Sequence, residues 1–153
     1  WFTKEILTLI KKEIPKIQFL IVGSNPSKEV LYLSSNNGVT VTGYVPDTRE
    51  YLYRATVVVV PLRIARGIQN KILEAMAMGI PVVATPQAFE GIEAQPERDL
   101  ILGENAEKIA KGVIKLIKEV SLRKFLGDNA RRVIENNYCW TKNLSKLDSF
   151  LNA

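Results

Sequence analysis

The sequence predicts an α/β fold, a three-layer sandwich in which helices cover both faces of a parallel sheet of about five strands. Short apolar runs rich in valine and isoleucine alternate with longer stretches of helical period, which is typical of repeated βαβ units. The run of four valines from Val57 to Val60 is apolar on both faces, so we expect it in the middle of the sheet. The 153 residues fit one domain, and residues 1–153 are interpreted as such.

The strands and helices are predicted from these patterns in chain order. The strands are Gln18 to Val22, Val39 to Val41, Val57 to Pro61, Pro81 to Ala84 and Leu100 to Leu102. The helices between them are Phe2 to Glu13, Lys28 to Ser34, Thr48 to Tyr53, Gln69 to Met78 and Ala106 to Val120. Two more C-terminal helices are expected, one with Ser121 as its N-cap and one after Thr141.

The opening helix has no strand before it from which to cross over. A βαβ pattern places a strand before each such helix, so we expect a further strand N-terminal to Trp1. The chain opens in an amphipathic pattern and contains no apolar run long enough for a membrane span, so we expect a cytoplasmic location.

Residue types limit the possible chemistry. The chain has no histidine and one cysteine, which excludes an internal disulfide, the usual zinc sites and histidine-based catalysis within the chain. The 21 Lys and Arg residues exceed the 16 Asp and Glu residues, and the resulting net charge of +5 favours anionic ligands. No metal site is expected.

The segment from Pro61 to Thr85 carries the clearest chemical signal. A loop containing Arg63, Arg66 and Gly67 joins the end of a buried strand to the start of a helix, where open α/β sheets bind ligands. Arginine side chains, a glycine and the helix N-terminus together suit a diphosphate. Glu74, inside that helix, suits the two hydroxyls of a ribose. The alternatives are solvated arginines, a turn at the glycine, and an ion pair of Glu74 with Lys71.

This segment resembles the donor-binding region of retaining glycosyltransferases with the GT-B fold. The resemblance rests on Glu74-Ala-Met-Ala-Met-Gly79-Ile-Pro81-Val-Val-Ala-Thr85, and extends to Phe19-Leu-Ile-Val-Gly23, Val41-Thr-Gly43-Tyr-Val-Pro46-Asp47, Tyr51-Leu-Tyr-Arg-Ala55 and the closing Tyr138-Cys-Trp140. It implies a Rossmann-like domain that is one half of a GT-B fold. It also implies a nucleotide-sugar donor as substrate, no cofactor, and a glycan or lipid-linked acceptor held by the other half, an acceptor domain N-terminal to Trp1.

The resemblance assigns binding roles but no catalytic residue. Glu74 would bind the donor ribose, the loop before it the diphosphate and sugar, Tyr44 and Val45 the base. The complete set of predicted donor-binding residues is Gly23, Ser24, Tyr44, Val45, Arg63, Arg66, Gly67, Ile68, Gln69, Asn70, Lys71 and Glu74.

The sequence departs from the family pattern at Arg66. This residue stands eight positions before Glu74, where the family has a glutamate that touches the sugar hydroxyls. The variant Arg66-Gly-Ile-Gln-Asn-Lys71 is similar to a subgroup of sugar transferases associated with exopolysaccharide export. In that subgroup we expect the arginine to meet the diphosphate or an anionic sugar.

Several weaker patterns have competing interpretations. The stripe of Lys108, Lys111, Lys115 and Lys118 is a solvated face or a contact with the inner face of an anionic membrane. Glu90 to Glu93 is a surface turn or a carboxylate at the cleft. Trp1, Tyr138 and Trp140 are scattered, which favours packing over stacking on nucleic acid, and no nucleic-acid partner is expected.

Two other function classes are alternatives to the transferase. A nucleotide-sugar epimerase has a similar fold and a different reaction. A non-catalytic α/β module of the receiver type needs an acidic cluster after the first strand, where this chain has Gly23-Ser24-Asn25.

Overall fold

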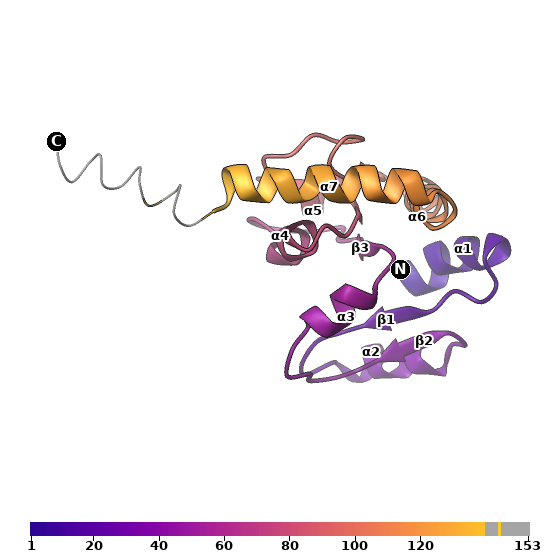
Figure 1. The fold of residues 1–153 in the computed structure, drawn as a ribbon. Helices are drawn as coiled ribbons and strands as arrows, with labels where there is room; N and C mark the ends of the chain where they lie inside the picture. Colours follow the sequence, from indigo (N-terminus) through magenta and orange to yellow (C-terminus); the bar gives the residue numbers. More distant parts are fainter. Residues whose placement is uncertain (140–143, 145–153) are drawn as a thin grey trace.

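The computed structural model describes residues 1–139 and 144, so Trp140 and the helix expected after Thr141 lie outside the described residues. The elements follow one another in an alternating βα order (Figure 1). The strands are β1 (Phe19–Ile21), β2 (Val39–Val41), β3 (Val58–Val60), β4 (Val82–Ala84) and β5 (Ile101–Leu102). The helices are α1 (Leu7–Glu13), α2 (Lys28–Tyr32), α3 (Arg49–Arg54), α4 (Asn70–Ala77), α5 (Pro86–Phe89), α6 (Ala106–Lys118) and α7 (Val120–Asn137).

All strand pairs are parallel, as the βα alternation predicts. β1 pairs with β2, with Phe19 opposite Val39. β3 pairs with β4, with Val58 opposite Val82, and β4 pairs with β5. Within residues 1–139 and 144, the strands therefore form a two-stranded and a three-stranded sheet, and the single continuous sheet that we expected is not formed. The predicted Rossmann-like α/β class is nevertheless confirmed, with helices on both sides of the strands.

The three layers follow from the alternation of side chains along β4. Val83 points to one side and belongs to a buried cluster with residues of α1 and α6, including Ile10 and Leu116. Val82 and Ala84 point to the other side and belong to a second cluster formed with α4, α5 and α7. Because successive side chains of a strand face opposite ways, one short strand serves both cores.

Helix ends show two differences from the sequence-based expectation. Ser121 is not an N-cap, because α7 already starts at Val120 with Glu119 as its N-cap. The guanidinium of Arg123 donates hydrogen bonds to the carbonyls of Leu116 (2.8 Å) and Ile117 (2.7 Å), which satisfies two carbonyl groups near the end of α6. The helix α5 was not predicted, although Thr85 followed by proline is a helix-start signal.

The start of the chain is helical, as predicted. A π-helical segment, Phe2–Ile6, continues directly into α1, and together they cover the range expected from the apolar spacing. The segment predicted as Lys28 to Ser34 divides into α2 and a 3₁₀ turn, Leu33–Ser35. Among the described residues, no helix combines the length and apolar character that crossing a membrane would require.

Candidate functional site

The predicted donor-binding residues follow the carboxyl ends of three strands. Gly23 and Ser24 come after β1, Tyr44 and Val45 after β2, and the loop from Arg63 leads from β3 into α4. Tyr44 is 76% exposed and makes no contribution to either core cluster. A large aromatic side chain that is left in solvent at the ligand-binding edge of a sheet is available to border a base.

Gly67 and the side chain of Gln69 define the conformation of the loop before α4. Gly67 has a φ of +67°, a conformation that favours glycine, and a Cβ atom built on it would meet nothing within 4 Å. The side-chain amide of Gln69 donates to the carbonyls of Gly67 (3.0 Å) and Arg66 (3.4 Å). Gln69 is the N-cap residue of α4, and its side chain forms no capping hydrogen bond. The first backbone N–H groups of α4 therefore have no side-chain partner at the cap.

α4 has one buried face and one exposed face. Ile72, Ala75 and Met76 are buried in the second core cluster, whereas Lys71 and Glu74 are exposed. Within residues 1–139 and 144, no ion pair connects Glu74 with Lys71, so the alternative interpretation of Glu74 as a partner of Lys71 is wrong for the described structure. The carboxylate of Glu74 is thus presented to solvent one turn inside the helix.

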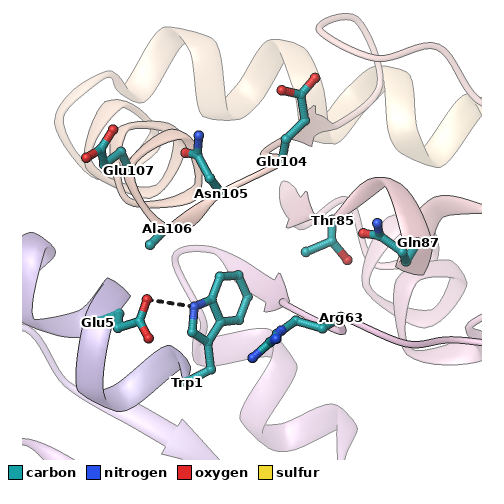
Figure 2. A pocket seen from close by; sticks show the side chains of 9 residues that line it. All are labelled: Trp1, Glu5, Arg63, Thr85, Gln87, Glu104, Asn105, Ala106 and Glu107. Carbon is teal, nitrogen blue, oxygen red and sulfur yellow. Dashed lines mark hydrogen bonds between the residues drawn. The ribbon is translucent and has the colours of Figure 1, made fainter.

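A cavity of about 480 Å³ lies at the carboxyl ends of β3, β4 and β5, next to Arg63 in the loop that joins β3 to α4 (Figure 2). Its lining residues are Trp1, Glu5, Arg63, Thr85, Gln87, Glu104, Asn105, Ala106 and Glu107. The Arg63 guanidinium lies 5.9 Å from the centre of the Trp1 ring, and the Trp1 indole N–H donates to Glu5 (2.9 Å). The stacked arginine is directed to this cavity by its contact with Trp1.

The walls of the cavity are formed by two helix starts. Thr85 is buried, accepts a hydrogen bond from the Ala88 N–H (3.2 Å) as the N-cap of α5, and donates to the Leu62 carbonyl (2.5 Å). Asn105 is the N-cap of α6 and accepts from the Lys108 N–H (2.9 Å). The ammonium of Lys108, hydrogen-bonded to Glu104 (2.6 Å), lowers the pKa of that carboxyl.

The structure separates the predicted residues into two groups. Arg63 lines the cavity with Trp1, whereas none of the other eleven predicted residues is among the lining residues. Apart from Arg63, none of the cavity residues, including Thr85 and Asn105, was predicted as a site residue from the sequence. A usable signal existed, because both residues follow predicted strands of a parallel sheet, whose carboxyl ends meet at one edge.

Other sequence patterns have plain structural roles. Two of the four α6 lysines form ion pairs, Lys108 with Glu104 and Lys118 with Glu13. The Tyr138 hydroxyl accepts a hydrogen bond from the Glu93 N–H (2.7 Å), which ties the turn after α5 to the end of α7. Tyr138 and Trp1 also pack against the core clusters, as expected. Over the described part of the chain, no three Asp, Glu, Cys or His side chains gather as a metal site would require.

Comparison with known proteins gives a consistent family match. The family model described as "Glycosyl transferases group 1" matches residues 1–119. An uncharacterised glycosyltransferase of Methanocaldococcus jannaschii is 29% identical over 153 residues, which covers 94% of this chain and 38% of that protein. The capsular polysaccharide biosynthesis glycosyltransferase CapM of Staphylococcus aureus is 26% identical over 145 residues, covering 90% of this chain and 38% of that protein.

Solved structures show the same fold. A mutant of TarM from S. aureus, in complex with fondaparinux, alpha-GlcNAc-glycerol and UDP, superposes with a TM-score of 0.81. It is 22% identical and covers 97% of this chain and 32% of that chain. The present chain therefore spans about two fifths, 38%, of the length of the curated relatives it matches.

Proposed function

The chain belongs to the group 1 glycosyltransferase family, and from this premise we propose that it binds the nucleotide-sugar donor in a sugar transfer reaction. The observation that carries the proposal is the uncapped start of α4 beside an open, glycine-containing loop at the carboxyl end of β3. The family match favours a transferase over the epimerase. The acceptor site then belongs to the part of the relatives that this chain does not cover.

The start of α4 is the proposed diphosphate site. Free N–H groups at a helix start and the positive end of the helix dipole attract phosphate. The open space next to Gly67 lets a phosphate approach the backbone, and Gln69 holds the loop in that conformation through the Gly67 carbonyl. In the transfer step, charge accumulates on the departing nucleoside diphosphate, and prearranged donors stabilise it.

Glu74 is the proposed ribose ligand. Its carboxylate is exposed and free of an ion pair with its nearest basic neighbour on α4, Lys71. An ionised carboxylate accepts hydrogen bonds only, and two oxygens can receive both hydroxyls of a ribose. Tyr44 at the end of β2 would border the base.

Arg66 is the proposed determinant of the donor sugar. Its side chain is exposed, and its carbonyl is fixed by Gln69, so the residue lies on the same loop as the diphosphate site. A guanidinium in a position where a carboxylate would accept sugar hydroxyls reverses the local charge. It therefore favours a sugar that carries its own carboxylate, or adds a contact to the diphosphate.

The biological setting is proposed from the relatives. CapM acts in capsular polysaccharide biosynthesis, and a comparable role in building a surface polysaccharide would require a glycan or lipid-linked acceptor. We place such a reaction in the cytoplasm, where nucleotide sugars are the donors, with peripheral contact at the inner face of the membrane.

Calorimetric titration tests the donor proposal. The chain is titrated with UDP, GDP and ADP and with their sugar conjugates, including a uronic acid conjugate. We expect one nucleotide to bind selectively, and Glu74→Ala to weaken it by about tenfold or more because hydrogen bonds to a charged group contribute about 1.5 to 3 kcal/mol. The matched control is Glu135→Ala, an exposed helical glutamate on α7.

Each outcome has a defined meaning. Equal loss of affinity in the Glu74 and Glu135 variants would remove Glu74 from the site. Arg66→Ala with unchanged affinity for every conjugate would remove Arg66. Absence of nucleotide binding by the full-length protein would contradict the proposed function itself.

A further inference from the structure

The loop that carries the proposed diphosphate site, residues 62–69, is held at both ends by residues that flank α5. We call it the donor loop. At its start, the Thr85 hydroxyl just before α5 donates to the Leu62 carbonyl (2.5 Å). At its end, the Ile68 side chain lies against the backbone of Gly91, because a Cβ atom built on Gly91 would be 3.3 Å from Cγ1 of Ile68. The position of the donor loop therefore depends on the segment around α5.

The turn after α5 presents its backbone to Ile68. Gly91 has a φ of +81°, a conformation that favours glycine. The next residue, Ile92, is buried in the second core cluster, and its N–H donates to the Phe89 carbonyl (3.0 Å). The turn is thus closed by its own hydrogen bond and packed on the core, and Gly91 provides a surface without a side chain on which Ile68 rests.

The far side of this turn is bonded to the end of α7. The Tyr138 hydroxyl accepts a hydrogen bond from the Glu93 N–H (2.7 Å), and the Asn137 side-chain amide donates to the Glu93 carbonyl (3.3 Å). Both backbone groups of one turn residue are therefore bonded to two consecutive residues at the end of α7. The Tyr138 ring packs against the second core cluster, so the hydroxyl is carried by a fixed ring.

These contacts form one continuous connection from α7 to the donor loop. Glu93, which Tyr138 holds, is two residues from Gly91, and Gly91 contacts Ile68. Ile68 stands between Gly67, where a phosphate can approach the backbone, and Gln69, whose side chain donates to the Gly67 carbonyl (3.0 Å). A shift of the turn would thus move the part of the loop that we propose as the diphosphate site.

The hydroxyl of Tyr138 contributes more to position than to overall stability. A phenylalanine ring would fill the same place in the core cluster. Glu93 is exposed, so water can replace the hydroxyl as the partner of its N–H, and the net loss of stability is small. The hydrogen bond does, however, select one position of the turn relative to α7.

We infer that Tyr138 is a positioning residue for the donor diphosphate: it holds the turn after α5, and this turn holds Ile68 and the Gly67 backbone in the geometry that receives the phosphates. The inference rests on the proposed function of the donor loop. Tyr138 acts through Glu93, Gly91 and Ile68 and does not itself touch the donor.

Nucleotide titration of the Tyr138→Phe variant tests the inference. In the full-length protein, we expect the affinity for the preferred nucleoside diphosphate to fall about threefold to tenfold, the equivalent of one hydrogen bond. The affinity for the unphosphorylated nucleoside should stay unchanged, because the donor loop contacts the phosphates. An unchanged affinity for the diphosphate, or an equal loss for the diphosphate and the nucleoside, would overturn the inference.

The matched control is Asn129→Ala. Asn129 is also on α7, and its side-chain amide donates to the Arg98 carbonyl (3.0 Å), in a loop that does not contact Ile68 in this way. We expect this variant to keep the wild-type affinity for both ligands. If it lowers the diphosphate affinity as much as Tyr138→Phe does, any weakened contact of α7 has the same effect, and the specific role of Tyr138 is refuted.

A double-mutant cycle tests the route through Ile68. Ile68→Ala removes the side chain that contacts Gly91, so Tyr138→Phe should cause no further loss of diphosphate affinity in that background. Losses that add in the double variant would contradict the route.

Methyl NMR without any nucleotide separates this inference from the proposed function. We expect the nuclear Overhauser contact between the Ile68 methyl groups and the Gly91 α-protons to weaken in Tyr138→Phe and to persist in Asn129→Ala. A contact of wild-type strength in Tyr138→Phe would overturn the inference even if the protein binds nucleotide. Absence of nucleotide binding by the wild type would instead contradict the proposed function, and with it the role of Tyr138 toward a diphosphate.

Discussion

The Cα of Gly127 in α7 lies against the carbonyl of Gly79, in the turn between α4 and β4: a Cβ atom built on Gly127 would lie 2.1 Å from that carbonyl oxygen. The oxygen belongs to the backbone, so it has little freedom to move. Gly79 itself has a φ of +69°, which ends α4 and directs the chain into β4. The contact fixes how closely α7 approaches α4 on the second core cluster.

We expect Gly127→Ala to destabilise the chain by about 1 to 3 kcal/mol, because the added methyl group overpacks a backbone contact. Helix propensity alone predicts the opposite sign, a gain of about 1 kcal/mol. Urea unfolding followed by circular dichroism measures the difference. Gly23→Ala is the control, since a Cβ there meets nothing within 4 Å. A more stable Gly127→Ala variant would show that the two helices separate easily.

The buried carboxylate of Asp99 predicts a pH dependence of stability. Burial raises its pKa, but hydrogen bonds from the Arg98 side chain (2.7 Å) and the Gln95 N–H (2.7 Å) lower the pKa more, and the net direction is down. A carboxyl with a lower pKa in the folded state stabilises the fold above its unfolded-state pKa of about 3.9. This contribution is lost as the pH falls through the folded-state pKa.

The variant Asp99→Asn tests that dependence. We expect it to cost about 1 to 3 kcal/mol at neutral pH and to flatten the loss of stability in acid. The measurement is the free energy of unfolding at several pH values. Asp128→Asn, at an exposed position on α7, is the control. Parallel pH profiles for wild type and Asp99→Asn would mean that another group is responsible.

The hydroxyl of Thr85 connects the start of α5 with the loop after β3. We expect Thr85→Val to cost about 1 to 2 kcal/mol, because it removes the cap of α5 and the donor to the Leu62 carbonyl. Thr85→Ser keeps the hydroxyl and should retain most of the stability. If Thr85→Val keeps the stability of the wild type and Thr85→Ser loses it, the methyl group and not the hydroxyl is important. Thermal unfolding of the three proteins distinguishes these results.

The free lysines of α6 predict an effect on vesicle binding. Lys108 and Lys118 are ion-paired, whereas Lys111 and Lys115 are exposed and have no ion pair among the described residues. We expect Lys111→Gln with Lys115→Gln to reduce flotation with anionic vesicles, at about 1 kcal/mol per charge. Lys28→Gln with Arg132→Gln is the charge-matched control. No difference between the two double variants would leave α6 as a solvated face.

Local patterns predicted the elements well. β2 has the predicted bounds, and the other strands lie within the predicted runs, because each apolar run has a turn residue on either side. The exposed and buried faces of α4 also follow from the spacing of Ile72, Ala75 and Met76. The N-cap of α7 is Glu119 and not the expected Ser121, and in this region Arg123 donates to carbonyls six and seven residues before it, a contact that the local pattern did not indicate.

The sequence by itself determined where the strands and, apart from α5, the helices of the described residues form, and which polar residues follow each strand end, because these features depend on neighbours within a few residues. Only the tertiary structure decided which strands pair, that Arg63 lies against Trp1 and not with the rest of the predicted loop, and that Gly127 must be a glycine. Those features join residues far apart in the chain. They depend on how closely whole elements pack, which no local pattern specifies.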